Sequence, residues 1–282
     1  MKKILGLLIG VFAAILFFAL FSLVSYYLGI NEGQEQYDEL AQLVQEAKPT
    51  APTIDPTDPI ATDPEATIPA ATEPVLVEAT SSSNGQKVMI LPEYKPIYEL
   101  NDDFVGWICI EDTRINYPVM QSPGRPNFYL DHGFDKSETD YGCPYVPRIC
   151  EVNRPSDNVI IYGHHKKNGT MFTDLTKFQK KSFWETHKTF SFDTLYEKQT
   201  FEIVVVFKTV VYTNSDKEFK YYQFADAETP EKFDAYLAEC QKRALYDTGV
   251  TAEYGDKLIT LSTCEYSRKN GRLVVVAKRV EE

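Results

Sequence analysis

The chain has 282 residues, a formal net charge of −12 and 43% hydrophobic residues. The excess of acidic side chains disfavours contact with a phosphate backbone, so we expect no nucleic-acid partner. The apolar fraction is large enough for a sizeable core, which excludes wholesale disorder. Five cysteines are too few, in a chain this long, to indicate a disulfide scaffold.

The charge is unevenly distributed along the chain. Residues 1–30 contribute +2, residues 31–93 contribute −10, and the remainder from Tyr94 contributes −4. Most of the acidity therefore precedes the region that is predicted to fold, and it says little about the substrate.

Residues 4–30 form an uncharged, predominantly apolar stretch that is long enough to cross a bilayer as a helix. A cleaved secretory signal is the alternative, but its apolar region spans only about 7–15 residues before an Ala-x-Ala-like cleavage site. We therefore expect a single-pass anchor that contacts membrane lipid through residues 4–30. Because Lys2 and Lys3 precede this stretch and acids follow it, the amino terminus is expected in the cytoplasm and the rest outside.

Residues 31–90 are predicted to be an extracytoplasmic stalk and linker. Apolar residues at roughly helical spacing in 34–47 suggest a short stalk helix. Seven of the sixteen prolines lie between Pro49 and Pro74, interspersed with Thr, Ala and Asp. Such a segment buries too little surface to fold and stays extended, which is typical of a spacer.

Residues 91–282 are predicted to form one domain, mainly β with added helices, as a barrel or closed sheet. Runs rich in Val, Ile, Tyr and Phe predict strands. These runs are 104–110, 117–120, 158–162, 201–212, 257–263 and 272–278. Helices are predicted over 170–178 and 230–246, the second with Thr229 as N-cap and Pro230 at its first position.

A cysteine at a strand end is the first candidate for chemistry. The apolar run from Lys257 ends in Ser262, Thr263 and Cys264, where loops leave room for a substrate. An inert buried cysteine is the alternative. However, an Asn-Gly turn follows, and Arg272 opens the next apolar run, so neighbouring strands would place Arg272 beside Cys264. A guanidinium there favours a thiolate and stabilises an oxyanion.

A thiol nucleophile also needs a proton carrier, and the chain has four histidines. His164 and His165 follow the predicted strand 158–162 and a glycine, again at a strand exit, whereas His187 lies in a polar context and is predicted to be solvated. A Cys–His pair with an arginine is a credible set for acyl transfer.

Several segments resemble the sortases, the membrane-anchored cysteine transpeptidases of Gram-positive bacteria. The two signature-like segments are IYGHHKKNGTMFTDL from Ile161 and TLSTCEYSRKNGRLVVVAKR from Thr260. DFVGWICIEDTRINYPVMQ from Asp103 and NFYLDHGFD from Asn127 resemble class B sortases in particular, as does an insertion over about 214–255.

The resemblance implies an eight-stranded β-barrel in which Cys264 is the nucleophile, His164 the catalytic histidine and Arg272 the active-site arginine. Cys264 would cleave a carboxyl-terminal sorting motif of secreted proteins after Thr through a thioester, with transfer to an amine of a peptidoglycan precursor. Ser262 and Thr263 would line the motif groove or merely finish the strand. No cofactor and no metal are expected, and the domain would face the cell wall.

Other functions remain open, and the chain departs from the class B sortase pattern at some positions. A pilin-polymerising sortase using a pilin lysine, a wall-associated cysteine peptidase and a tethered binding domain with an inactive barrel are the competing functions. Many class B members have Asn after the catalytic histidine, where this chain has His165. Cys143 and Cys150 are candidates for a disulfide or, with His164 and His165, for a metal site, although the spacing matches no standard zinc pattern.

Overall fold

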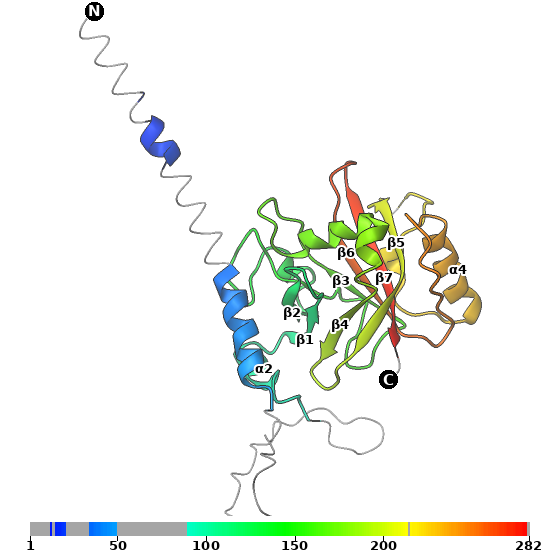
Figure 1. Ribbon diagram of the computed structural model, residues 1–282, viewed down its shortest axis with the longest axis horizontal. Helices are drawn as coiled ribbons and strands as arrows, with labels where there is room; N and C mark the ends of the chain where they lie inside the picture. Colours follow the sequence, from blue (N-terminus) through cyan, green and yellow to red (C-terminus); the bar gives the residue numbers. More distant parts are fainter. Residues whose placement is uncertain (1–11, 13–14, 21–33, 50–88, 214, 281–282) are drawn as a thin grey trace, which may run out of the picture.

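One seven-stranded sheet organises the described part of the protein (Figure 1). The computed structural model describes residues 12, 15–20, 34–49, 89–213 and 215–280. The strands are β1 (Phe104–Cys109), β2 (Asn116–Met120), β3 (Asn158–Tyr162), β4 (Thr189–Thr194), β5 (Thr200–Val210), β6 (Leu258–Cys264) and β7 (Gly271–Val280). Their order is β2-β1-β4-β5-β7-β6-β3, and only the β3–β6 pair is parallel.

The sheet carries apolar side chains on both faces, and each face has its own core. Along β7, Leu273, Val275 and Ala277 enter the larger core, while Val274 and Val276 enter the second one. This alternation follows from the two-residue period of a strand. It explains why the sequence of β7 reads as a continuous apolar run rather than as an alternating one.

The helices are short and cover the sheet. They are α2 (Lys95–Leu100), η1 (Phe128–Leu130), η2 (Phe172–Gln179), α3 (Lys181–Trp184), η3 (Tyr221–Gln223) and α4 (Pro230–Gln241). The side-chain oxygen of Thr229 caps α4 by accepting from the backbone of Lys232, as predicted. Helix α4 supplies Phe233 and Tyr236 to the second core and lies against one side of the sheet (Figure 1).

The predicted stalk segment is helical over residues 34–46, and this helix packs onto the domain. Tyr37, Leu40 and Val44 are buried in the larger core. The Tyr37 hydroxyl donates a 2.7 Å hydrogen bond to the carbonyl oxygen of Gly142. The 34–46 helix lies on the opposite side of the molecule from α4 (Figure 1). These residues therefore share the core of the folded region, rather than standing apart from it.

The predicted eight-stranded closed barrel is wrong in strand number and closure. Seven strands form in the described residues, and the edge strands β2 and β3 are not joined by a ladder. Tyr145 alone bridges them, through isolated pairings with Met120 and Tyr162. Pro144 and Pro147 lie next to this bridge, and proline lacks the N–H that an extended ladder needs, so an eighth strand does not develop there.

The predicted membrane anchor lies mostly outside the described residues. Within the described ranges, none of the helices has both the length and the apolar character needed to cross a bilayer. The proline-rich part of the predicted linker, residues 50–88, also lies outside them.

Candidate active site

The parallel pairing of β3 with β6 brings His164 and Cys264 to the same edge of the sheet. Asn158 pairs with Leu258 and Tyr162 with Ser262, so partners differ by a constant 100 residues. Because parallel strands run in the same direction, the residues that end or follow them lie at the same edge of the sheet. One register therefore places both candidate residues at one edge.

The antiparallel pairing of β6 with β7 places Arg272 directly opposite Cys264, as predicted. The turn between these strands depends on glycine. Asn270 has a left-handed φ of 58°, and a Cβ at Gly271 would collide with the carbonyl oxygen of Glu265. Without a side chain there, the backbone N–H of Glu265 bonds the Gly271 carbonyl at 3.0 Å and closes the hairpin.

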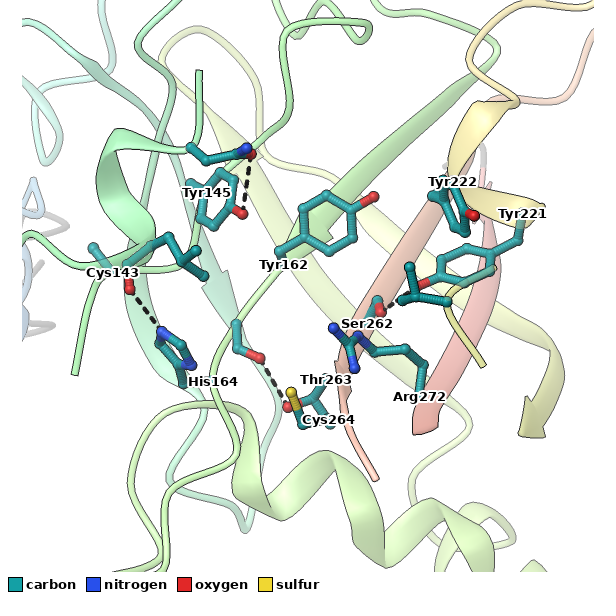
Figure 2. Close-up of a pocket in the computed structure, with 14 residues that line it drawn as sticks. Cys143, Tyr145, Tyr162, His164, Tyr221, Tyr222, Ser262, Thr263, Cys264 and Arg272 are labelled. Atoms are coloured by element: carbon teal, nitrogen blue, oxygen red, sulfur yellow. Dashed lines mark hydrogen bonds between the residues drawn. The ribbon is translucent and has the colours of Figure 1, made fainter. Parts of the chain in front are cut away.

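A pocket of about 340 Å³ lies at this edge, and all five candidate residues line it. Figure 2 shows His164 on one side and Arg272 on the other, with Cys264 between them. The segment after β3 thus supplies an imidazole to this cavity, the end of β6 supplies a thiol, and β7 supplies a guanidinium.

His164 is half-buried, and a hydrogen bond fixes its tautomer. Its Nε2 lies 2.6 Å from the carbonyl oxygen of Leu130. Since a carbonyl can only accept, Nε2 carries the proton and Nδ1 is the basic nitrogen of the neutral ring. Burial is the main cause that lowers the pKa of His164 below its ordinary value, and the charges of Lys166 and Arg272 act in the same direction.

Cys264 has a free thiol and is half-buried at the end of β6. Arg272 donates from Nη1 to the carbonyl of Gly271 at 2.9 Å. Burial raises the pKa of Tyr145 and of Tyr221 to about 12, although the charge of Arg272 opposes the rise. Both phenols are therefore neutral hydrogen-bonding groups at pH 7, and they add no charge to the pocket.

Ser262 and Thr263 line the pocket, but their hydroxyls are already engaged. The Ser262 hydroxyl lies 2.7 Å from the Tyr221 hydroxyl, and the Thr263 hydroxyl donates to the Gly163 carbonyl at 2.8 Å (Figure 2). Both residues are almost completely buried. Thr263 thus links β6 to the segment after β3, whereas Ser262 is hydrogen-bonded to Tyr221, which also lines the pocket.

None of the tyrosines that form the aromatic wall of the pocket was predicted from the sequence. Tyr145, Tyr162, Tyr221 and Tyr222 line it. Tyr162 had a usable signal, because it precedes His164 by two residues on an extended segment and so shares its face. Tyr145 and Tyr221 come from distant loops and a 3₁₀ turn, where no local pattern indicates that they reach the site.

The other cysteines and His187 do not assemble a second site in the described chain. Cys143 and Cys150 are both free, so the alternative of a disulfide between them is wrong. Cys143 lines the pocket, but burial raises the pKa of its thiol strongly. His187 is not solvated as predicted, because its ring stacks on Phe183 at 3.9 Å. Among the described residues, no cluster of three or more His, Cys, Asp or Glu side chains could hold a metal ion.

The strand-end thiol with its histidine and arginine is the kind of site found in cysteine acyl-transfer enzymes. A sortase-domain family model matches residues 108–280. Sortase B of Staphylococcus aureus is 33% identical over 195 residues, which cover 68% of this chain and 76% of that protein. Sortase B of Listeria monocytogenes is 33% identical over 204 residues, covering 72% and 78%.

Solved structures agree with the sequence relatives. The S. aureus sortase B–substrate complex superimposes with a TM-score of 0.68 at 26% identity, covering 90% of this chain and 99% of that one. The chain belongs to the sortase family, in its class B. It is accordingly a cysteine transpeptidase, a class of enzyme that joins sorting-motif substrates to an amine acceptor.

Proposed function

We propose that this sortase cleaves a carboxyl-terminal sorting motif of secreted proteins after threonine and transfers them to an amine of a peptidoglycan precursor. The observation that supports this most directly is that His164 and Cys264 line one pocket at the shared edge of β3 and β6, with Arg272 opposite Cys264. The S. aureus relative has been solved as a complex with its substrate, which is consistent with a peptide in the corresponding pocket here.

In the first half-reaction, neutral His164 takes the proton of the Cys264 thiol, and the sulfur attacks the threonine carbonyl carbon to form a tetrahedral oxyanion. The Arg272 guanidinium stabilises this negative charge by hydrogen bonding. His164, as imidazolium, protonates the nitrogen of the leaving amine, the C–N bond breaks, and a thioester remains on Cys264. A lowered pKa makes the imidazolium of His164 a stronger acid for this step.

In the second half-reaction, neutral His164 removes a proton from the incoming amine, whose nitrogen attacks the thioester. Collapse of the second oxyanion forms the new amide and expels the Cys264 thiolate, which takes the proton back from His164. The lowered pKa keeps most of the His164 population neutral at pH 7, which suits this role as a base.

Substitution of the nucleophile tests the assignment of Cys264. Cys264→Ala is expected to abolish cleavage of a sorting-motif peptide, measured by loss of a quenched fluorophore pair. Cys109→Ala is the matched control, because Cys109 is also a free, half-buried thiol but does not line the pocket. His164→Ala should likewise abolish cleavage, and Arg272→Ala should lower turnover by about 10²–10³-fold. An active Cys264→Ala protein would exclude the proposal.

The acceptor is tested by mass spectrometry of the products. With a glycine peptide as the amine, the sorting peptide should appear joined to glycine. Water as the only acceptor would instead indicate a cysteine peptidase. Selective joining to a pilin lysine would indicate a pilin-polymerising enzyme.

We also propose that the chain is held at the cell membrane through residues 4–30, with its domain facing the wall. The support is the uncharged apolar stretch and the two lysines that precede it. Protease added outside intact protoplasts should degrade the domain, and full protection of the domain would contradict this topology.

A further inference from the structure

The backbone carbonyl of Cys264, the candidate nucleophile, makes no hydrogen bond to β7. The backbone N–H of Glu265 bonds the Gly271 carbonyl at 3.0 Å, so Glu265 and Gly271 form a hydrogen-bonded pair. Hydrogen-bonded and non-bonded pairs alternate along an antiparallel ladder. The next pair, Cys264 with Arg272, is therefore non-bonded, and the backbone groups of Cys264 point to the side of β6 on which β3 lies.

On that side β3 has already ended, and the His165 side chain contacts the backbone of β6 where a neighbouring strand would otherwise pair. Gly163 still donates its N–H to the Ser262 carbonyl at 3.1 Å. Two residues further along β6, the acceptor is the Cys264 carbonyl, and His165 Nδ1 lies 2.9 Å from it. Because a carbonyl only accepts, Nδ1 must carry the proton. This bond joins the segment of the candidate histidine to the backbone of the candidate nucleophile.

Tyr266 holds the His165 segment in this place. The two rings lie 4.8 Å apart, and the Tyr266 hydroxyl donates to the His165 backbone carbonyl at 2.8 Å. On its other side, His165 forms an isolated bridge with Met171. Although Tyr266 is 68% exposed, its hydroxyl is thus hydrogen-bonded to His165 and its ring contacts the His165 ring.

We propose that His165 and Tyr266 form a latch that positions Cys264, so that both are positioning residues for the transfer reaction. The proposal rests on the proposed function of Cys264. The thiol moves with the backbone of the last residue of β6, and a displacement of about 1 Å at a reacting atom costs about 100-fold in rate. Neither His165 nor Tyr266 is among the residues that line the pocket, so the latch acts on turnover rather than on peptide binding.

The tautomer of His165 tests the latch without any reference to activity. In full-length protein labelled with ¹⁵N-histidine, the latch requires the proton of neutral His165 on Nδ1, although an unconstrained imidazole has no such requirement. Long-range ¹H–¹⁵N spectra report the tautomer directly, and the signal is assigned by its loss in His165→Asn. Finding the proton on Nε2 would overturn the latch.

Kinetics of paired variants test its effect on the reaction. His165→Phe keeps a ring but removes the donor, and we expect kcat to fall about tenfold or more with KM within about twofold. His165→Asn places an amide donor near the position of Nδ1 and should restore most of the lost kcat. Tyr266→Phe removes the hydroxyl alone and should lower kcat, whereas Tyr254→Phe, an exposed tyrosine that does not line the pocket, should not.

The outcomes separate the latch from the proposed function. If the wild-type protein cleaves no sorting peptide, the proposed function fails while the tautomer still decides whether the latch forms. If the wild type is active and His165→Phe keeps its kcat, or if His165→Asn loses as much kcat as His165→Phe, the latch is rejected.

Discussion

His164 combines burial with nearby positive charge, and both lower its pKa. Burial disfavours the charged imidazolium, while Lys166 and Arg272 repel it. The hydrogen bond from Nε2 to the Leu130 carbonyl raises the pKa; it is weaker than burial but stronger than either charge alone. The site therefore favours a histidine that is neutral at pH 7.

A titration followed by NMR measures this effect. The midpoint for His164 should lie below the ordinary value of about 6.5. Lys166→Met should raise the midpoint, because it removes a charge that destabilises the imidazolium. Lys167→Met is the control, since its exposed neighbouring charge is not among the causes of the shift. A wild-type midpoint at or above 6.5 would contradict this account.

At the level of single residues, the site residues that lie at the ends of strands could be predicted from the sequence. Cys264 and Arg272 are opposite because a short polar turn joins two apolar runs, a pattern visible in the sequence. The partners of these groups were not visible. The Leu130 carbonyl that binds His164 and the Tyr221 hydroxyl that binds Ser262 belong to segments brought in by tertiary packing.

At the level of elements, the 34–46 helix is the largest difference from expectation. Its apolar spacing predicted a helix correctly, but spacing alone does not show which surface covers the apolar face. The structure buries that face against the domain, with the Tyr37 ring edge-on to Tyr117 at 5.3 Å. A domain that begins near residue 90 would lack this cover and expose apolar core.

Two leucines on the 34–46 helix give a matched test of this packing. Leu40 is 5% exposed and Leu43 is 37% exposed. Leu40→Ala should lower the free energy of unfolding by about 2–5 kcal/mol, because it leaves a cavity in the core. Leu43→Ala should change it by less than about 1 kcal/mol, since alanine suits a helix and little surface is lost. Equal effects in urea unfolding would show that the helix is not docked.

The strand prediction succeeded for a compact apolar run and failed for a strand that alternates apolar and polar residues. β3 was predicted with its observed bounds, since it is a compact run of Val, Ile and Tyr. β4 was missed, although Thr189–Thr194 alternates Phe with polar residues in the two-residue period of a half-buried strand. The predicted helix over 170–178 is instead the 3₁₀ segment η2, because its hydrogen bonds close over three residues rather than four.

At the scale of the whole molecule, the sheet separates two cores, and buried polar groups of β3, β6 and α4 are hydrogen-bonded to one another beside the second core. The apolar runs of β6 and β7 predicted burial, but no run shows that the sheet stays open, with only isolated bridges at Tyr145 between the described edge strands β2 and β3. On the face of β6 that carries the second core, Thr260 is fully buried and donates to the Asn158 side chain at 2.7 Å. The Tyr236 hydroxyl of α4 lies 3.3 Å from the same Thr260 oxygen.

Thr260→Val tests whether this polar junction contributes to stability independently of the site. Valine keeps the shape of threonine but leaves the Asn158 oxygen and the Tyr236 hydroxyl without this partner inside the protein. The expected loss is about 1–3 kcal/mol in the free energy of unfolding, the penalty of an unsatisfied buried group. Thr189→Val at an exposed strand position should stay within about 0.5 kcal/mol. Because Thr260 does not line the pocket, peptide cleavage per folded molecule should be unchanged, and a fall in kcat without a fall in stability would instead place Thr260 in the catalytic apparatus.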